Sequence, residues 1–157
     1  MHPSSGLASP SGGFPVLSHE SIITVADHPT SILISLYSDR LMFVITQVGT
    51  LGTIVHAQKE SILGGGTTYS TATLLGHRDD PLPELCARQL IEKISTSVAG
   101  FNLPILVCLG LDRKLIANIN NRNDNNSVVS SAGGKNIVAT IVDTCFSSAT
   151  QLIQAAA

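Results

Sequence analysis

The sequence LMFVITQVGTLGTIV, residues 41–55, carries the strongest strand signal in the chain. It opens with five consecutive apolar residues and runs through Thr-Gln into a short segment bounded by Gly49 and Gly52. Glycines at these places allow the positive φ that tight turns require. A second run rich in β-branched residues starts at Thr53. The stretch therefore predicts two strands joined by a turn.

Similar apolar runs predict further strands on both sides of this pair. Most of the connections between the first five runs are short and contain Asp, Pro or Gly, which are turn residues. Such connections are too short for parallel crossovers, so we expect these five strands to be antiparallel. The predicted strands span residues 21–26, 31–37, 41–47, 53–57, 67–75 and 104–109.

Helical periodicity appears only after the fifth strand. Asp80 is placed to cap a helix with Pro81 at its first position, and Gly100 is placed to end it. A second amphipathic helix is predicted to begin near Asn136. Helices that come late in the chain gather on one face of an antiparallel sheet. The predicted fold is therefore α+β, with two helices packed on one face of a six-stranded sheet.

The chain length fits one domain. Its 157 residues suit a single hydrophobic core, which we place in residues 16–157. Residues 1–15 are rich in Ser, Gly and Pro and are predicted to be a disordered tail. Residues 113–134 are rich in Asn and Ser and are predicted to be a flexible loop.

Composition argues against several classes of partner. The net charge is −2, and no basic cluster is longer than Arg113-Lys114, so nothing resembles a phosphate-binding stripe. No run approaches the ~18 apolar residues that a bilayer requires. The three cysteines lie inside apolar runs, as buried thiols do in a reducing compartment. We therefore expect no nucleic-acid or membrane partner and a cytoplasmic location, which could extend to the nucleus.

Motifs for chemistry are weak. His77, Asp79 and Asp80 could be metal ligands, but they are nearly contiguous, and a strand end followed by a helix cap explains them. The glycine-rich segments lack the phosphate-loop pattern. A small thioesterase-like enzyme would need an activated Cys86, or His56 facing a polar pocket. We expect no catalytic residue, no metal and no cofactor.

One face of the predicted sheet lacks a cover. The runs at residues 41–45 and 105–109 are apolar at every position, whereas a strand with one wet face should alternate. Two helices can cover only one face, so a second molecule is the simplest cover for the other, either a second copy or a different chain. The alternative is that the N-terminal tail or the Asn-rich loop folds across it. The predicted dimer residues are Met42, Val44, Leu106 and Cys108, or else the opposite set, Phe43, Ile45, Ile105 and Val107.

Two blocks of this sequence resemble the proteasome assembly chaperone 3 family. The first is residues 41–55, with a hydrophobic strand, Thr-Gln, a glycine-bounded turn and Gly-Thr before the next strand. The second is Leu74-Leu75-Gly76, followed by an acidic stretch with Pro81-Leu82, a helix and the strand at 105–109. The similarity covers roughly residues 18–113. It departs at the N-terminal start, at the three consecutive glycines 64–66 and in the Asn-rich insertion.

This resemblance implies a six-stranded antiparallel sheet with flanking helices and a function without catalysis. It further implies a heterodimer with a proteasome assembly chaperone 4-like partner, which helps proteasome α-subunits assemble into the α-ring. A homodimer in isolation is also compatible with the sequence. The competing hypothesis is a dimeric scaffolding or trafficking module of the longin or roadblock type, which also dimerises through antiparallel sheets with flanking helices.

Overall fold

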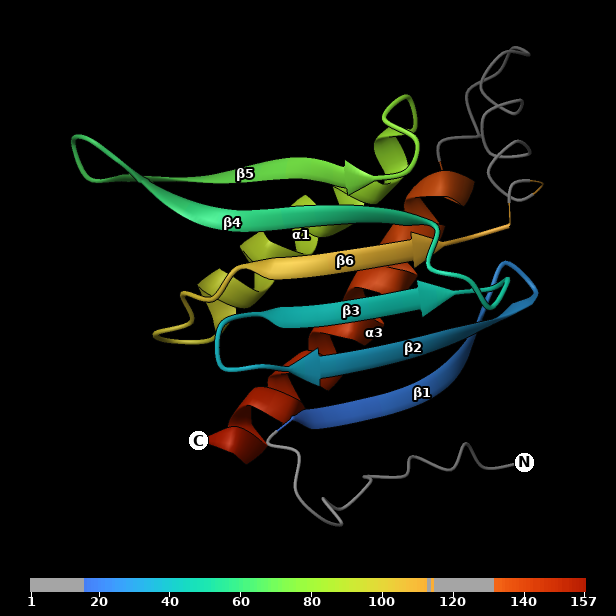
Figure 1. The fold of residues 1–157 in the computed structure, drawn as a ribbon, viewed down its shortest axis with the longest axis horizontal. Coiled ribbons are helices and arrows are strands. Elements are labelled where there is room, and N and C mark those ends of the chain that lie inside the picture. The colour runs from blue at the N-terminus through green and yellow to red at the C-terminus, as the bar shows by residue number, and fades with distance from the viewer. Residues whose placement is uncertain (1–15, 113, 115–131) are drawn as a thin grey trace.

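A computed structural model describes residues 16–112, 114 and 132–157 (Figure 1). The predicted tail and most of the predicted Asn-rich loop lie outside these residues. The described elements follow in the order β1 (Leu17–Val25), β2 (His28–Leu36), β3 (Leu41–Thr46), β4 (Thr53–Ile62), β5 (Gly66–Leu75), α1 (Pro81–Ser97), β6 (Ile105–Gly110) and α3 (Ala132–Ala156).

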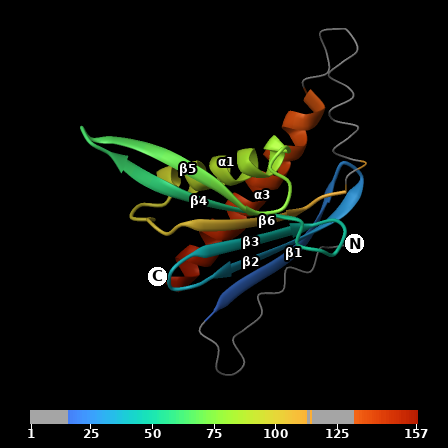
Figure 2. The same ribbon diagram turned by 45° about the horizontal axis from the view of Figure 1, so that its top comes forward.

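The six strands form one sheet in the order β1-β2-β3-β6-β4-β5. Both helices cross the same face of it, as two views show (Figures 1 and 2). The α+β class and the placement of the helices are therefore confirmed. The antiparallel prediction is wrong for one pair of strands, because β3 and β6 run parallel.

The direction of β6, and with it the parallel pair β3–β6, follows from helix α1, which joins β5 to β6. A helix that joins two strands of one sheet usually forms a crossover between parallel strands. Here β5 and β6 are both antiparallel to β4, so they are parallel to each other, with α1 between them. β6 enters between β3 and β4, which run in opposite directions. A strand in that position must be parallel to one neighbour and antiparallel to the other.

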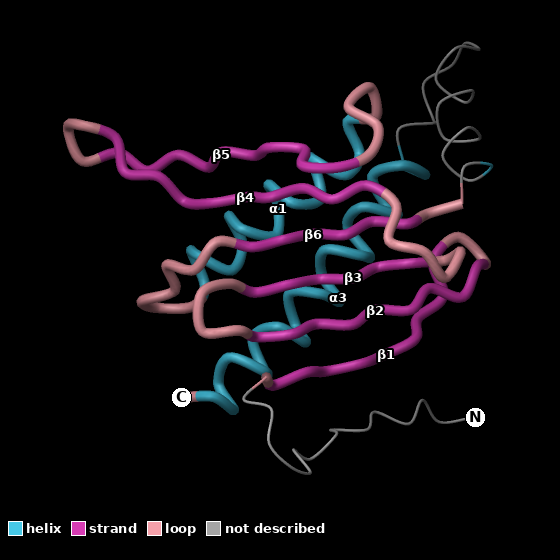
Figure 3. Tube along the Cα trace, viewed as in Figure 1, coloured by secondary structure: helices cyan, strands magenta, loops and turns pink. Residues whose placement is uncertain are grey.

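The hairpin of β4 and β5 is longer than predicted. β4 was expected to end at residue 57, but it continues to Ile62 and pairs with the first half of β5 (Figure 3). The expected glycine link is a tight turn, in which Gly64 and Gly65 have φ values of 109° and 92°. All residues from 58 to 67 are exposed. This outer half lacked a sequence signal because neither of its faces is buried.

The start of α1 follows the predicted capping. The Asp80 carboxylate accepts a hydrogen bond of 3.0 Å from the Leu82 backbone N–H, and Pro81 is the first helical residue. The helix ends at Ser97, before Gly100, whose φ is 78°.

The second helix, α3, begins at Ala132, four residues before the predicted start near Asn136.

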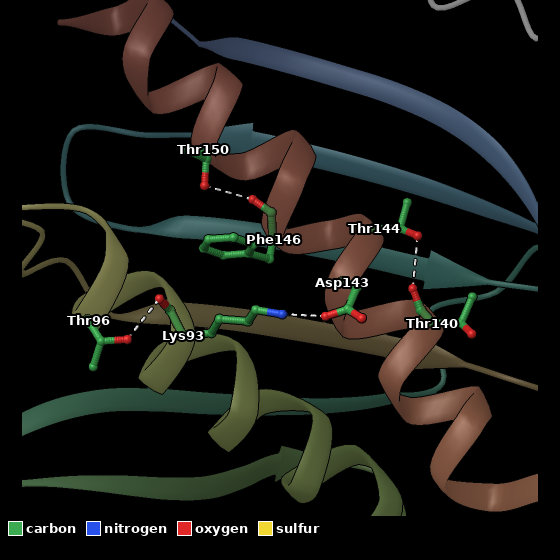
Figure 4. A network of polar contacts seen from close by, with 7 residues as sticks. All are labelled: Lys93, Thr96, Thr140, Asp143, Thr144, Phe146 and Thr150. Atoms are coloured by element: carbon green, nitrogen blue, oxygen red, sulfur yellow. Dashed lines mark hydrogen bonds and ion pairs between the residues drawn. The ribbon is translucent and has the colours of Figure 1, made fainter. Parts of the chain in front are cut away.

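The two helices also contact each other along their sides (Figure 4). The Lys93 ammonium pairs with the Asp143 carboxylate and lies 5.0 Å from the centre of the Phe146 ring. Both charged side chains are well exposed, so the pair contributes little to stability. Buried side chains of both helices belong to one core with the sheet, including Cys86, Leu90, Ile94, Ile141, Cys145 and Ala149.

Candidate protein-interaction face

Burial alternates along β3 and, together with the strand register, identifies the two faces of the sheet. On β3, Leu41, Phe43 and Ile45 are fully buried, whereas Met42 and Val44 are partly exposed. The buried set faces the helices, because side chains alternate along a strand and the core lies between sheet and helices. We call the opposite, helix-free side the open face. Its apolar centre is made of Leu33, Met42, Val44, Ile54, Leu106 and Cys108, and Ser35 and His56 adjoin this centre.

The strand register brings the first predicted set together. Met42 lies opposite Leu106, and Val44 lies opposite Cys108 on the neighbouring strand. All four side chains are on the open face, where Met42, Val44 and Leu106 are partly exposed and Cys108 is 3% exposed. The alternative set, Phe43, Ile45, Ile105 and Val107, is fully buried on the helix side. The structure thus settles which set points away from the helices, and dimerisation through it stays a prediction.

Neighbouring strands widen the apolar centre. Leu33 on β2 lies opposite Val44, and Ile54 on β4 lies opposite Cys108. Neither residue was among the predicted dimer residues. The sequence contains a signal for Leu33, because its position between Ile32 and Ile34 places it on the opposite side of the strand from them.

The border of the open face is more polar. The Ser18 and Ser35 hydroxyls are hydrogen-bonded at 3.0 Å, Glu20 lies beside Leu33, and His56 lies beside Leu106. The outer strands also carry exposed apolar side chains, since Ile22 and Leu75 are 65% and 62% exposed. The border is therefore only partly polar, whereas the usual protein–protein interface has an apolar centre and a polar border.

The Thr-Gln pair of the sequence signature joins three segments at the end of β3. The Gln47 side-chain amide donates hydrogen bonds to the Thr30 hydroxyl at 3.0 Å and to the Val25 carbonyl at 3.4 Å. Its oxygen accepts a bond of 3.1 Å from the Asp112 backbone N–H. Gln47 therefore fixes the β1–β2 turn and the segment after β6 to the end of β3.

We expect Gln47→Leu to lower the free energy of unfolding by about 1–3 kcal/mol, because the buried Thr30 hydroxyl loses a donor and the Asp112 N–H loses its acceptor. Urea unfolding measures the change. Gln58→Leu is the matched control, since among the residues that the structure describes this exposed amide bonds to Glu60 alone, and its loss should cost less than about 0.5 kcal/mol. Equal effects of the two substitutions would contradict the structural role of Gln47.

The residues considered for catalysis do not form a site. Cys86 lies on α1 in the core, while His56 lies on the open face, so the sheet separates them. Burial raises the pKa of the Cys86 thiol to about 12, and the nearby Asp80 carboxylate adds to the effect. Burial likewise raises the pKa of Cys145 to about 12 and raises that of Cys108. None of these shifts activates a nucleophile.

Alkylation with iodoacetamide at pH 8 should therefore leave Cys86 and Cys145 unmodified in the folded protein. With a pKa of about 12, only about one thiol in 10⁴ is ionised at this pH. Intact-mass measurement reads the result, and the same reaction in guanidinium should modify all three cysteines. Rapid labelling of Cys86 in the folded chain would revive the hydrolase hypothesis.

The predicted polar cluster borders a cavity of about 910 Å³ at the end of the sheet. His77, Asp79 and Asp80 line it together with Val48 and Asp112. Asp80 is engaged as the helix cap. Within the described residues, no group of three or more His, Cys, Asp or Glu side chains is arranged to hold a metal ion.

In that same part of the chain, no helix is long and apolar enough to cross a bilayer.

Comparison with solved structures supports the fold. A chain from the crystal structure described as a novel chaperone complex for yeast 20S proteasome assembly aligns with a TM-score of 0.52. The alignment covers 81% of this chain and 97% of the other. At 13% identity this similarity shows a shared fold.

Sequence comparison is more specific. The family model described as Proteasome assembly chaperone 3 matches residues 43–120. The protein of that name from Bos taurus is 30% identical over 108 residues, which cover 67% of this chain and 87% of the relative. The protein of that name from Homo sapiens is 29% identical over 101 residues, which cover 63% and 80%. These matches confirm the resemblance seen in the strand–turn–strand signature, and the chain belongs to the proteasome assembly chaperone 3 family.

Proposed function

We propose that this chain promotes assembly of the proteasome α-ring without catalysis, by binding α-subunits as part of a heterodimer. The partner would be a second small chaperone resembling proteasome assembly chaperone 4, seated on the open face. The observation that carries the proposal is the apolar centre of that face, built around Met42, Val44, Leu106 and Cys108, on a chain of this family. In the isolated chain, a second copy could occupy the same face.

Such a chaperone works through differential affinity. It stabilises an assembly intermediate by binding it more tightly than the separated subunits. Release then requires that later subunits compete for the bound surface or change its shape. No step needs a nucleophile, a metal or a cofactor. We propose the cytoplasm, and with it the nucleus, as the compartments in which the chain acts, and a fluorescent fusion would locate it.

The test is affinity purification of the tagged full-length chain from its own cells, followed by mass spectrometry. The proposal expects proteasome α-subunits without mature β-subunits, together with one small partner of similar size. Recovery of the chain alone, or with membrane-traffic proteins, would refute the proteasome role. The second of these results would favour the scaffolding hypothesis.

A further inference from the structure

β5 is an edge strand with an unusual composition for that position. Only β4 pairs with it in the described sheet, so its outer side presents free backbone N–H and C=O groups. Its register with β4 is regular from Gly66 to Thr73. The strand reads GTTYSTATLL and contains no charged residue and no proline. The opposite edge, β1, carries His19 and Glu20.

Free edges in natural proteins usually carry a device that prevents pairing with other chains. Charges, prolines, bulges and very short strands are the common devices. On β5 only the inner end has one, a register irregularity near Leu75 opposite Ile54 and Val55. The inner half is also tied to α1, where the Thr73 hydroxyl donates to the Glu84 carboxylate at 2.8 Å. The outer half extends beyond the helices as a two-stranded ribbon (Figure 1), and such ribbons are marginally stable alone.

We propose that β5 pairs with β5 of a second copy of this chain. The two strands would run antiparallel about a two-fold axis near Ser70 and join two sheets into one. In this register Thr68 lies opposite Ala72 of the other copy, and Tyr69 lies opposite Thr71. β5 itself brings no charge to the pair, while Glu60 of β4 accepts a hydrogen bond of 2.6 Å from the Ser70 hydroxyl beside the axis. Pairs of aromatic and β-branched residues stabilise antiparallel strands.

The strand's own chemistry favours a second copy over a foreign segment. A two-fold interface must be self-complementary, and a neutral, threonine-rich strand meets that condition in an antiparallel arrangement. The pairing uses a surface separate from the centre of the open face. It therefore goes beyond the proposed heterodimer and could join two such heterodimers.

Hydrogen exchange on the full-length chain tests the proposal directly. Met42→Asp is included in every sample, so that association through the open face does not contribute. Over a hundredfold rise in protein concentration, we expect the mass in solution to shift from monomer to dimer. Exchange should slow in β5 at about half of its amides, those that point away from β4, and stay unchanged in β1.

Charge variants supply the matched comparison. Thr68→Lys with Ala72→Lys places like charges opposite each other and should abolish both the mass shift and the protection of β5. Ile22→Lys with Thr24→Lys adds the same charge to exposed positions of the other edge and should change neither. Mixing the Lys pair with a chain carrying Thr68→Glu and Ala72→Glu should restore dimers, which excludes misfolding as the cause.

Three results would overturn the proposal. The first is a chain that stays monomeric, with β5 exchange independent of concentration. The second is concentration-dependent protection in β1. The third is protection of β5 only after a different purified protein is added, which would assign the edge to a foreign strand.

Discussion

Met42→Asp is expected to abolish binding of the partner chaperone while the chain stays folded. Met42 is partly exposed in the single chain, so an Asp carboxylate at this position can remain in contact with water. In the heterodimer the same carboxylate would be buried among apolar side chains without a partner. That burial costs at least about 4 kcal/mol, which corresponds to a rise of about 10³-fold in the dissociation constant. Co-purification and light scattering measure the loss, and circular dichroism confirms the fold.

Phe43→Asp is the matched control, one residue further along the same strand. Phe43 is fully buried on the helix side, so its replacement places a charge in the core. We expect this variant to be unfolded at 25 °C. If Met42→Asp kept its partner, the open face would not be the interface. If it unfolded like Phe43→Asp, Met42 would belong to the core that stabilises the single chain.

The contrast between Met42 and Phe43 could not be predicted from the sequence, because it depends on which side of β3 faces the helices. Every position from Leu41 to Ile45 is apolar, so the run predicts a strand buried on both sides without indicating which side meets the helices. That assignment depends on contacts with α1 and α3, which lie far away in sequence. Flanking residues such as Thr46 do not resolve it, because polar residues at a strand end are common on either face.

The fold itself was more accessible to sequence. All six strands, the cap of α1 at Asp80 and the helices on one face follow from local patterns and turn residues. The parallel pair β3–β6 was missed because the order of strands is a long-range property. The helix between β5 and β6 was the available signal for it, since a helical crossover usually joins parallel strands. The outer half of the hairpin was missed for a different reason: with neither face buried, it has no hydrophobic period.

The turn between β3 and β4 leads to the second large effect, which concerns Gly52. Its φ is +58°, and a Cβ atom at this position would lie 2.2 Å from the Leu109 carbonyl oxygen and 2.7 Å from the Gly110 Cα. These are backbone atoms of β6, so they cannot move aside without shifting the strand inserted between β3 and β4. Gly110 is constrained in return, because its own Cβ would lie 2.3 Å from the Thr50 carbonyl oxygen.

We expect Gly52→Ala to lower the free energy of unfolding by about 3 kcal/mol, the sum of about 1 kcal/mol for positive φ and about 2 kcal/mol for the backbone contact. For a chain of this size the melting temperature should fall by about 6–12 °C.

Gly49→Ala is the matched control in the same turn. Gly49 has a φ of +71° and nothing within 4 Å of a built Cβ, so only the backbone term of about 1 kcal/mol applies. Equal losses for the two variants would mean that the conformation of the turn, and not the close approach to β6, sets the requirement for glycine. A larger loss at Gly52 would show that glycine at this position of the signature allows β6 to enter between β3 and β4.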